Sequence, residues 1–307
     1  FSKESTSTDV FDIAQYAKMV ATGGKRFRPY LSYVALGTSD PDEHFELFAS
    51  VELLHVFALI HDDIMDNGTT RHGVVCAQRF FAKQYGGDRI GEGLATLLGD
   101  LVYQWSYESM FSYTRSHPKH AGELIDTFAQ LIREVIHGQM LDVLSPVQVA
   151  LSEDLIIQKM YLKTARYSFV QPMRLGYIAG GTIDQHSAFT ETYGRALGLM
   201  FQLQDDLLDV TEGHDKSSFL DVETNQQTLL SWYMRTKVAP DTAGAFAGYL
   251  GRALTADDRH QVAQILEHSG ARAYVLSEID RYYQEALSSA MSPCWIEIAT
   301  MVAQRKK

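Results

Sequence analysis

The most informative segment of the 307-residue chain reads His61-Asp62-Asp63-Ile64-Met65-Asp66, and its pattern recurs in Gln204-Asp205-Asp206-Leu207-Leu208-Asp209. Both segments lie within long runs whose apolar residues recur at helical spacing, so we expect both to be helical. Carboxylates at positions i, i+1 and i+4 of a helix lie at about 0°, 100° and 40° around its axis. The three aspartates of each cluster are therefore expected to point into one quadrant of their helix.

The two acidic clusters indicate a site for divalent metal ions. Three like charges in one quadrant repel one another, and nothing nearby in the sequence neutralises them. Mg²⁺ prefers few carboxylates, several waters and the phosphate oxygens of a substrate. Two clusters that face each other would clamp a diphosphate through bridging metal ions. The alternative is a solvated acidic face on each helix, which the repetition of the pattern in a similar apolar setting disfavours.

The bulk composition is that of an ordinary globular chain. Hydrophobic residues make up 46% of the sequence, charged residues make up 21%, and the formal net charge is −11. This charge argues against a nucleic-acid partner, and it means that a polyanionic substrate needs local cations. No apolar run reaches the roughly 18 residues of a transmembrane helix. The nearest is the run over residues 51–60, which Glu52 and His55 interrupt.

Cysteine usage and chain length bear on the compartment and the domain count. Cys76 and Cys294 give no disulfide framework and favour a reducing compartment, so we expect a cytoplasmic protein. No signal peptide is visible, although the sequence begins at Phe1 rather than at methionine. A length of 307 residues allows one large domain, and no linker interrupts the chain, so we predict a single domain over residues 1–307.

The distribution of helix-breaking residues predicts an all-α protein, because seven prolines and few alternating β-branched runs leave little room for strands. Asp40-Pro41 is a start signal and Asn67-Gly68 a stop signal for the helix that carries the first cluster. The helix that carries the second cluster is expected to begin at Asp184, with a polar loop over 211–225 after it. Further helices are predicted up to about Val20, from Pro29, over 90–114, from Pro118 to Pro146 and from Ser152 to Gly180.

Several ordered motifs resemble those of the trans-isoprenyl diphosphate synthase (polyprenyl synthetase) family. Gly24-Lys25-Arg26-Phe27-Arg28-Pro29 matches the GKxxRP of the family, and the two clusters match its two DDxxD motifs. Shorter matches are Gly99-Asp100, Gly138-Gln139, Lys163-Thr164 and the segment from Phe201 to Asp206. The resemblance covers nearly the whole chain. It implies the isoprenoid synthase type of fold, a bundle of about ten or more helices around a deep central cavity, and a homodimer.

The resemblance also implies the reaction. An allylic diphosphate, such as dimethylallyl (DMAPP), geranyl (GPP) or farnesyl (FPP) diphosphate, ionises to a carbocation and is joined to isopentenyl diphosphate. Metal ions on Asp62, Asp66 and Asp205 would stabilise the charge on the departing pyrophosphate. Three Mg²⁺ ions per active site are implied, with Mn²⁺ as an alternative. The remaining members of the clusters are further ligands or orient metal-bound water: Asp63, Asp206 and Asp209.

Cationic residues are assigned to the diphosphates by the same resemblance. Lys25, Arg28 and His55 would bind isopentenyl diphosphate, which does not ionise and can be held by direct cations. Arg71 and Lys163 would contact the allylic diphosphate. The alternatives are a solvated turn for Lys25 and Arg28, and a core histidine for His55.

Polar residues without charge complete the expected site. Thr164 and Gln202 would place oxygen dipoles near the carbocation, although a structural role is the more usual one for such residues on a helix. Asp100, Gln139 and Asp142 would make supporting polar contacts.

Two positions depart from the family pattern. His72 stands where a second arginine is usual, and Gln226 stands where the second of two lysines is usual, the first being Lys216. A histidine is largely neutral at pH 7. Because each change removes a cation from a diphosphate site, we predict weaker substrate binding than is usual in the family, without loss of the chemistry.

Product length has its own signal in Phe57 and Ala58. Phe57 precedes Asp62 by five residues, which places it about 7.5 Å along the helix from the metal site. Its ring would form part of the floor of a pocket for the hydrophobic chain. The geranylgeranyl-forming members of the family resemble this arrangement, so we predict a C20 product, with C15 second. The alternative for Phe57 is an ordinary core position.

Two other functions fit parts of the pattern. A class I terpene cyclase ionises the same substrate, but such cyclases usually replace the second cluster with an Asn/Ser/Glu metal motif. A non-catalytic or regulatory subunit of a heteromeric prenyl synthase is expected to have lost an acidic cluster, and both are present here. We therefore predict a Mg-dependent trans-prenyltransferase.

Overall fold

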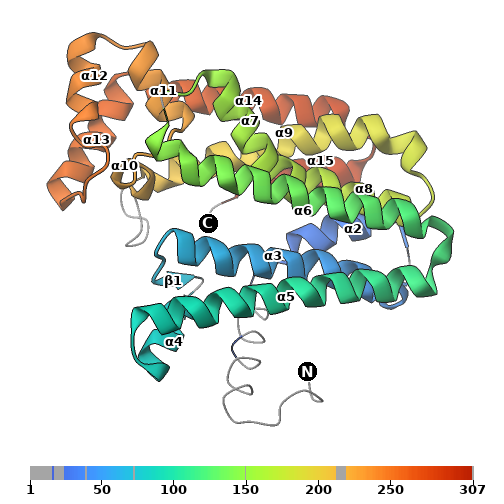
Figure 1. Cartoon of the computed structure of the whole chain (residues 1–307). Coiled ribbons are helices and arrows are strands. Elements are labelled where there is room, and N and C mark those ends of the chain that lie inside the picture. The colour runs from blue at the N-terminus through green and yellow to red at the C-terminus, as the bar shows by residue number, and fades with distance from the viewer. Residues whose placement is uncertain are drawn as a thin grey trace. The chain divides into compact units, whose positions relative to one another are not determined.

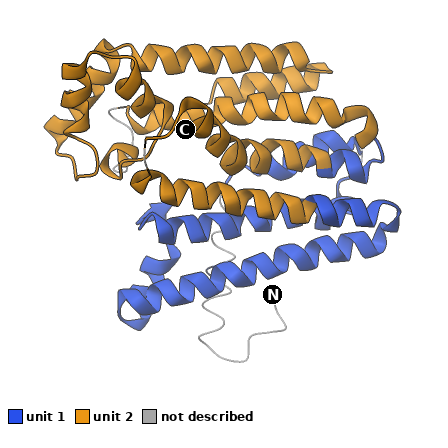
Figure 2. Ribbon diagram, turned by 45° about the horizontal axis from the view of Figure 1, so that its top comes forward, with its two compact units in different colours: residues 1–127, 175–182 blue, residues 128–174, 183–307 orange. Residues whose placement is uncertain are grey.

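The computed structural model describes residue 16 and residues 24–38, 40–71, 73–148, 150–211 and 219–305. Within these ranges almost all regular structure is helical, which confirms the predicted all-α class (Figure 1). The chain divides into two compact units, unit 1 with residues 1–127 and 175–182, and unit 2 with residues 128–174 and 183–307 (Figure 2). The single domain over the whole chain stays a prediction.

Unit 1 contains the elements that surround the first acidic cluster. In chain order they are α2 (Phe27–Leu36), η1 (Asp42–His44), α3 (Phe45–Met65), β1 (Thr70–Arg71), β2 (Val74–Val75), α4 (Ala77–Tyr85), α5 (Asp88–Ser116) and η2 (Pro118–His120). Two helices, α6 (Ala121–Leu144) and α8 (Gln171–Ala179), have residues in both units.

Unit 2 contains the second acidic cluster. Its elements after α6 are η3 (Ser145–Val147), α7 (Glu153–Met160), η4 (Tyr161–Val170), α9 (Ile183–Asp209), α10 (Leu220–Glu223), α11 (Leu229–Thr236), α12 (Pro240–Ala247), α13 (Ala256–His268), α14 (Ala271–Ser289) and α15 (Pro293–Ala303).

The long helices α3 and α5 pack against each other in unit 1. Val56 and Ile60 of α3 and Leu98 and Val102 of α5 belong to one buried apolar cluster. Gly99 lies at a close contact between the two helices, because a Cβ atom at this position would stand 2.2 Å from Nε2 of His61. The motif glycine therefore lets α5 approach the end of α3 that carries the first cluster.

A short β-hairpin follows α3. The helix ends at Met65, and Asn67 takes a positive φ of 55°, so the predicted stop signal is confirmed. Strands β1 and β2 then pair antiparallel, with Arg71 opposite Val74. The sequence did not predict this hairpin. Strands of two residues are too short to show an alternating pattern in the sequence.

The helix α9 is the centre of unit 2. It packs against α14 and against η4, which is a π-helix of ten residues rather than the continuation of α7 that the sequence predicted. π-Helical turns are rare and often occur at functional sites, and η4 carries Lys163 and Thr164. Gly138 of α6 allows the backbone of η4 to come close, because a Cβ atom at residue 138 would stand 2.4 Å from the backbone nitrogen of Lys163.

Other predicted boundaries are close to the observed ones. The helix predicted from Pro29 begins two residues earlier, at Phe27, and the helix predicted from residue 90 begins at Asp88. Ser152 caps α7 as expected, and its hydroxyl accepts a hydrogen bond from the backbone of Leu155. The first predicted helix lies outside the described residues, apart from Tyr16.

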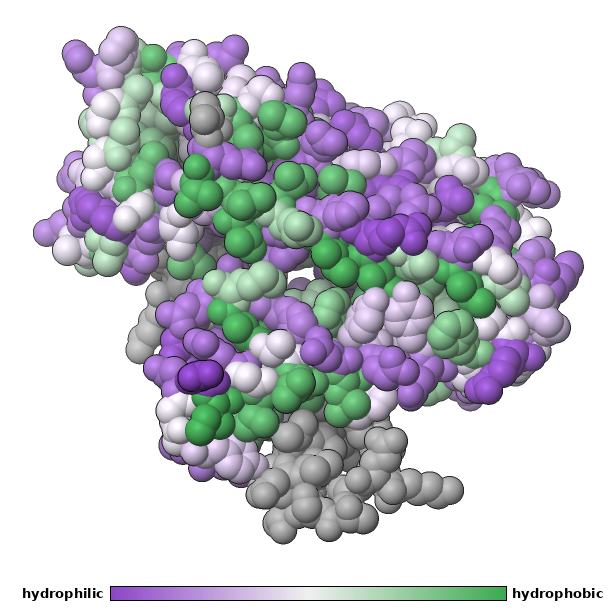
Figure 3. Space-filling model, viewed as in Figure 1, coloured by the Kyte–Doolittle hydropathy of each residue, from purple (hydrophilic) through white to green (hydrophobic). Residues whose placement is uncertain are grey.

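Large apolar side chains reach the surface in both units. Leu97 of α5 is 64% exposed and Val147 of η3 is 80% exposed. On the face drawn in Figure 3, green apolar groups lie among purple polar ones. No helix within the described ranges is long and apolar enough to cross a membrane.

Candidate active site

The first acidic cluster occupies the end of α3. Asp62 and Asp63 lie in its last turn, and Asp66 follows as the C-cap, with its backbone N–H bonded to the Asp62 carbonyl at 2.8 Å. Asp63 is buried, Asp62 is half-buried and Asp66 is exposed. The two positions expected to bind metal are therefore the two that reach the surface of unit 1.

Arg71 of the hairpin holds this cluster. Its Nε donates to Oδ1 of Asp63 at 2.8 Å, and one of its terminal nitrogens lies 3.3 Å from Oδ2 of Asp62. Burial opposes the charge of Arg71, but the bond and the charges of the two aspartates outweigh it, so the pKa of Arg71 is raised. The expectation that nothing nearby neutralises the cluster was wrong, because the hairpin folds back onto the helix end.

The turn between helix and hairpin is also fixed by Gln78 of α4. Its side-chain nitrogen donates to the backbone carbonyls of Asp63 at 2.7 Å and of Gly68 at 2.9 Å. His61 lies beside the motif residue Asp100, with Nε2 and Oδ1 3.7 Å apart. These contacts set the direction in which the cluster faces.

The second cluster occupies the end of α9 and has a similar construction. Asp206 is buried and accepts a hydrogen bond from the side-chain nitrogen of Gln202 at 2.8 Å. The oxygen of the same amide accepts from the hydroxyl of Thr164 at 2.5 Å. Burial raises the pKa of Asp206 to about 6, although the bond from Gln202 and the charge of Lys159 lower it.

The outer two residues of the second cluster have different partners. Asp205 pairs with Arg305, which follows α15. Asp209 accepts hydrogen bonds from the backbone nitrogens of Leu220 at 3.0 Å and Asp221 at 3.1 Å. Asp209 therefore holds the start of α10, as an N-terminal cap does.

Lys163 and Lys159 both pair with Asp142. Lys159 Nζ lies 3.0 Å from one carboxylate oxygen, and Lys163 bonds the other. Burial opposes the charge of Asp142, but the two ammonium groups outweigh it and lower its pKa. The side chain of Gln226 also reaches this place, where its nitrogen lies 3.4 Å from the Asp142 carbonyl.

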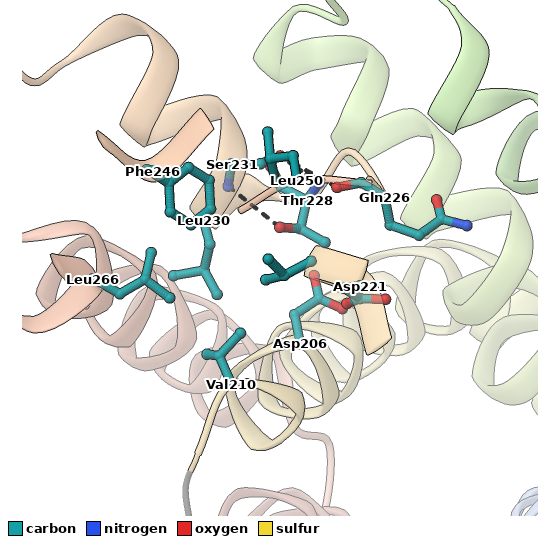
Figure 4. A pocket seen from close by; sticks show the side chains of 11 residues that line it. Asp206, Val210, Asp221, Gln226, Thr228, Leu230, Ser231, Phe246, Leu250 and Leu266 are labelled. Atoms are coloured by element: carbon teal, nitrogen blue, oxygen red, sulfur yellow. Dashed lines mark hydrogen bonds between the residues drawn. The ribbon is translucent and has the colours of Figure 1, made fainter. Parts of the chain in front are cut away.

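Asp221 is a neighbour of the second cluster that no sequence motif indicated. It lines a small cavity with Asp206, Val210, Thr228 and Leu230 (Figure 4). The cavity has about 10 Å³ open to the centre of a water molecule, which is room for about one water. Burial raises the pKa of Asp221 to about 7, and the negative charges of Asp206 and Asp142 add to the effect.

Gln139 lies on α6 in unit 2, and the remaining predicted diphosphate-binding residues lie in unit 1 or outside the described ranges. Lys25 is exposed before α2, and Arg28 on α2 and His55 on α3 are half-buried. Between Lys25 and Arg28, Arg26 forms an ion pair with Glu52 of α3. His72 and Lys216 lie outside the described residues.

Phe57 and Ala58 are half-buried on α3. The ring of Phe57 lies 4.8 Å from that of His61 and 5.0 Å from that of Tyr103 on α5, measured between centroids. Tyr103 in turn contacts Tyr107 at 5.3 Å. An aromatic row therefore leads away from the helix end that carries the first cluster.

The donor set suits some metals better than others. Among the described residues, no three His, Cys, Asp or Glu side chains are gathered into a ready metal cage. One or two carboxylates per ion fit Mg²⁺, which keeps waters and takes phosphate oxygens. They do not fit a closed structural zinc site.

Comparison with known proteins gives consistent results. A family model described as polyprenyl synthetase matches residues 12–268. A short chain isoprenyl diphosphate synthase of Methanothermobacter thermautotrophicus is 30% identical over 218 residues, which are 69% of this chain and 63% of that protein. An octaprenyl diphosphate synthase of Escherichia coli is 28% identical over 67% of this chain and 60% of its own length. The chain thus spans less than two thirds of either relative.

Solved structures match over nearly the whole chain. A geranylgeranyl pyrophosphate synthase from Corynebacterium glutamicum, complexed with isoprenyl diphosphate and magnesium, has a TM-score of 0.87 and 25% identity. The match covers 98% of this chain and 92% of that one. The predicted isoprenoid synthase type of fold is thereby confirmed.

Proposed function

Because the chain belongs to the polyprenyl synthetase family, we propose that it joins isopentenyl diphosphate head-to-tail to an allylic diphosphate, as a trans-prenyltransferase. The observation that carries the proposal is the shared construction of the two acidic clusters. In each, the second aspartate is buried and held by a neighbouring donor, Arg71 for Asp63 and Gln202 for Asp206. The first aspartate of each cluster stays partly exposed.

In this proposal Asp62, Asp66 and Asp205 hold divalent ions, three Mg²⁺ per site, with Mn²⁺ as an alternative. The bound ions supply charge that favours departure of the allylic pyrophosphate. The buried aspartates, Asp63 and Asp206, act by fixing the helix ends from which the outer carboxylates project. Mg²⁺ is supported by the sparse carboxylate set and by the magnesium in the similar structure.

The protein groups around the allylic diphosphate bind and orient it. Arg71 and Lys163 are cations beside the two clusters, each already paired with a carboxylate of its own unit. Thr164 and Gln202 form a hydrogen-bonded pair in which the amide oxygen of Gln202 is held in place. We assign them to the stabilisation of positive charge on the allylic carbon, since fixed oxygen dipoles need no reorganisation during the reaction.

Isopentenyl diphosphate is assigned to Lys25, Arg28 and His55, with His72 as the weaker neighbour. Lys216 is assigned to the allylic diphosphate. The replacement of the usual cations at His72 and Gln226 is expected to raise the Michaelis constants rather than to abolish turnover. The variants His72→Arg and Gln226→Lys test this, and unchanged Michaelis constants would contradict it.

The proposed product is geranylgeranyl diphosphate, with the C15 product second and DMAPP, GPP or FPP as primer. Phe57 supports this length, because its ring and the ring of Tyr103 stand together below the first cluster. The names of the similar proteins range from short chain to octaprenyl synthases.

We also propose a homodimer and a cytoplasmic location. The location is supported by the free cysteines Cys76 and Cys294.

One assay tests the proposed activity against its rivals. The purified chain is incubated alone with Mg²⁺, an allylic diphosphate and labelled isopentenyl diphosphate, and the products are separated by chain length. We expect longer diphosphates, and the variants Asp62→Asn and Asp205→Asn should each reduce the rate at least a hundredfold, on the order of the loss from removing one group that stabilises developing charge. Hydrocarbons would indicate a cyclase instead, and no product from any of the three primers would indicate a non-catalytic subunit.

A further inference from the structure

The second cluster has a resident cation that the sequence did not reveal. Arg305 pairs with the carboxylate of Asp205, and its guanidinium carbon lies 3.7 Å from the centroid of the Phe201 ring. Phe201 and Asp205 are one helical turn apart on α9, so the guanidinium lies against both at once. The side chain of Arg305 is only 17% exposed.

The backbone near Arg305 is fixed to α9. The side-chain nitrogen of Gln204 donates to the carbonyl of Ala303, the last residue of α15, at 3.0 Å. The backbone nitrogen of Arg305 donates to the carbonyl of Val302 at 3.3 Å. Arg305 therefore reaches the second cluster from a position that the fold determines.

The same two helices are joined further back along the chain. The hydroxyl of Tyr193 on α9 donates to the carbonyl of Trp295 on α15. Tyr193 contacts Trp295, and Asp205, later on α9, contacts Arg305, which is later in the chain than Trp295. The helices α9 and α15 therefore run in the same direction. The position of Arg305 is thus set by contacts near both ends of α15.

A guanidinium and a divalent ion compete for the oxygens of one carboxylate. Arg305 cannot give up its charge by deprotonation, because arginine stays protonated in proteins. Loss of the arginine charge therefore does not end its contact with Asp205, and a divalent ion must displace the guanidinium from the carboxylate oxygens. A charge-assisted pair that is half-buried and stacked on an aromatic ring is stronger than an exposed pair.

We propose that Arg305 is a positioning residue that holds Asp205 and exchanges with the divalent ion, and so sets the metal concentration at which the second cluster is loaded. The proposal rests on the proposed function, in which Asp205 holds metal. A purely structural role for Arg305 would instead affect only the stability of the α9–α15 pair.

Binding of Mg²⁺ in the presence of saturating inorganic pyrophosphate tests this, by calorimetry on the full chain at one pH and one ionic strength. Arg305→Met keeps an unbranched side chain over Phe201 but removes the charge, and should bind Mg²⁺ about threefold to tenfold more tightly, the range expected for one partly buried ion pair. Arg305→Lys should stay near the wild type. Arg252→Met is the matched control, because Arg252 pairs with Asp258 elsewhere in unit 2, and it should leave the affinity unchanged.

The outcomes distinguish the exchange at Arg305 from the metal-binding role of Asp205. Thermal unfolding in chelator first shows that the Arg305→Met variant is folded. If the folded variant binds Mg²⁺ no more tightly than the wild type, the proposed exchange between Arg305 and the divalent ion is overturned. Asp205→Asn should weaken Mg²⁺ binding at least tenfold. If Asp205→Asn leaves the binding unchanged, the proposed metal role of Asp205 fails, whatever Arg305→Met does.

Discussion

The side chain of Gln202 donates a hydrogen bond to the carboxylate of Asp206, one turn further along α9, at 2.8 Å. Asp206 is buried, and burial disfavours its charged form. The bond from Gln202 acts in the opposite direction, and Gln202 is itself held by Thr164 of the π-helix η4. The charge of the second cluster is therefore controlled by a residue that lies outside the DDxxD motif.

Replacement of Gln202 should change the pH dependence of the reaction. In Gln202→Leu the pKa of Asp206 rises further, so less of the carboxylate is charged at pH 7. Loss of one hydrogen bond to a charged group should lower kcat/KM at pH 7 by about tenfold to a hundredfold, with partial recovery at higher pH. Thr164→Ser keeps the hydroxyl and is the control. A pH–rate profile identical to that of the wild type would refute this role.

Asp221 should make the metal-free chain less stable as the pH rises. Its pKa is raised to about 7 in the fold by burial, whereas an aspartate in the unfolded chain titrates near 3.9. The folded state thus binds the extra proton, and this stabilisation is full below pH 4 and is lost as the pH rises through 7.

Thermal unfolding in chelator measures this effect. The stability of Asp221→Asn relative to the wild type should increase from pH 4 to pH 7 and then level off, because the amide does not ionise. Asp241→Asn on α12, whose aspartate is exposed, is the control. A constant difference between Asp221→Asn and the wild type across this range would contradict the raised pKa.

Phe57 should limit the length of the product. Its ring stands against His61 and Tyr103, so Phe57→Ala should open space and shift the products beyond C20. Phe48→Ala is the matched control, because Phe48 lies on the same helix but packs against Tyr33 and His44. Chromatography of the products decides, and an unchanged distribution for Phe57→Ala would remove Phe57 as the determinant.

Cys76 should resist alkylation in the folded protein. Burial raises the pKa of its thiol to about 12, and the neighbouring charge of Asp63 adds to this. The thiolate is the reactive form, so iodoacetamide at pH 8 should leave Cys76 unmodified in native protein and modify it once urea is added. Mass spectrometry of the peptides reads this directly. Equal modification of Cys76 with and without urea would show that the thiol is accessible and charged.

The sequence predicted the fold wherever a regular period or a strong break carries the information. The C-terminal end of α3 and the start of α7 follow from Asn67-Gly68 and Ser152, whose preferences act locally, whereas α3 begins at Phe45, after a 3-10 turn that follows Asp40-Pro41. The π-helix η4 could not be predicted, because π-helices are rare and no residue preference marks them in a sequence. It occurs where Gly138 lets another helix come close, which is a tertiary contact.

The candidate site was predictable for the residues within motifs and not for their partners. The second cluster is helical, as expected, and so are Asp62 and Asp63, whereas Asp66 is the C-cap of α3. The glycine of Gly99-Asp100 has a clear packing reason. Arg305 and Asp221 were missed, because their neighbours are known only after the chain has folded. Arg305 pairs with a residue 100 positions away, and no local pattern marks such a pair.

The most direct test of the central claim asks whether the two clusters bind the same pyrophosphate. The affinity for inorganic pyrophosphate with Mg²⁺ is measured for the wild type, Asp62→Asn, Asp205→Asn and the double variant. If both clusters hold one pyrophosphate, each single variant should weaken binding. The change in binding free energy of the double variant should then differ from the sum of the two single changes by more than about 0.5 kcal/mol. Strict additivity of the two changes, or no change in either single variant, would contradict the account.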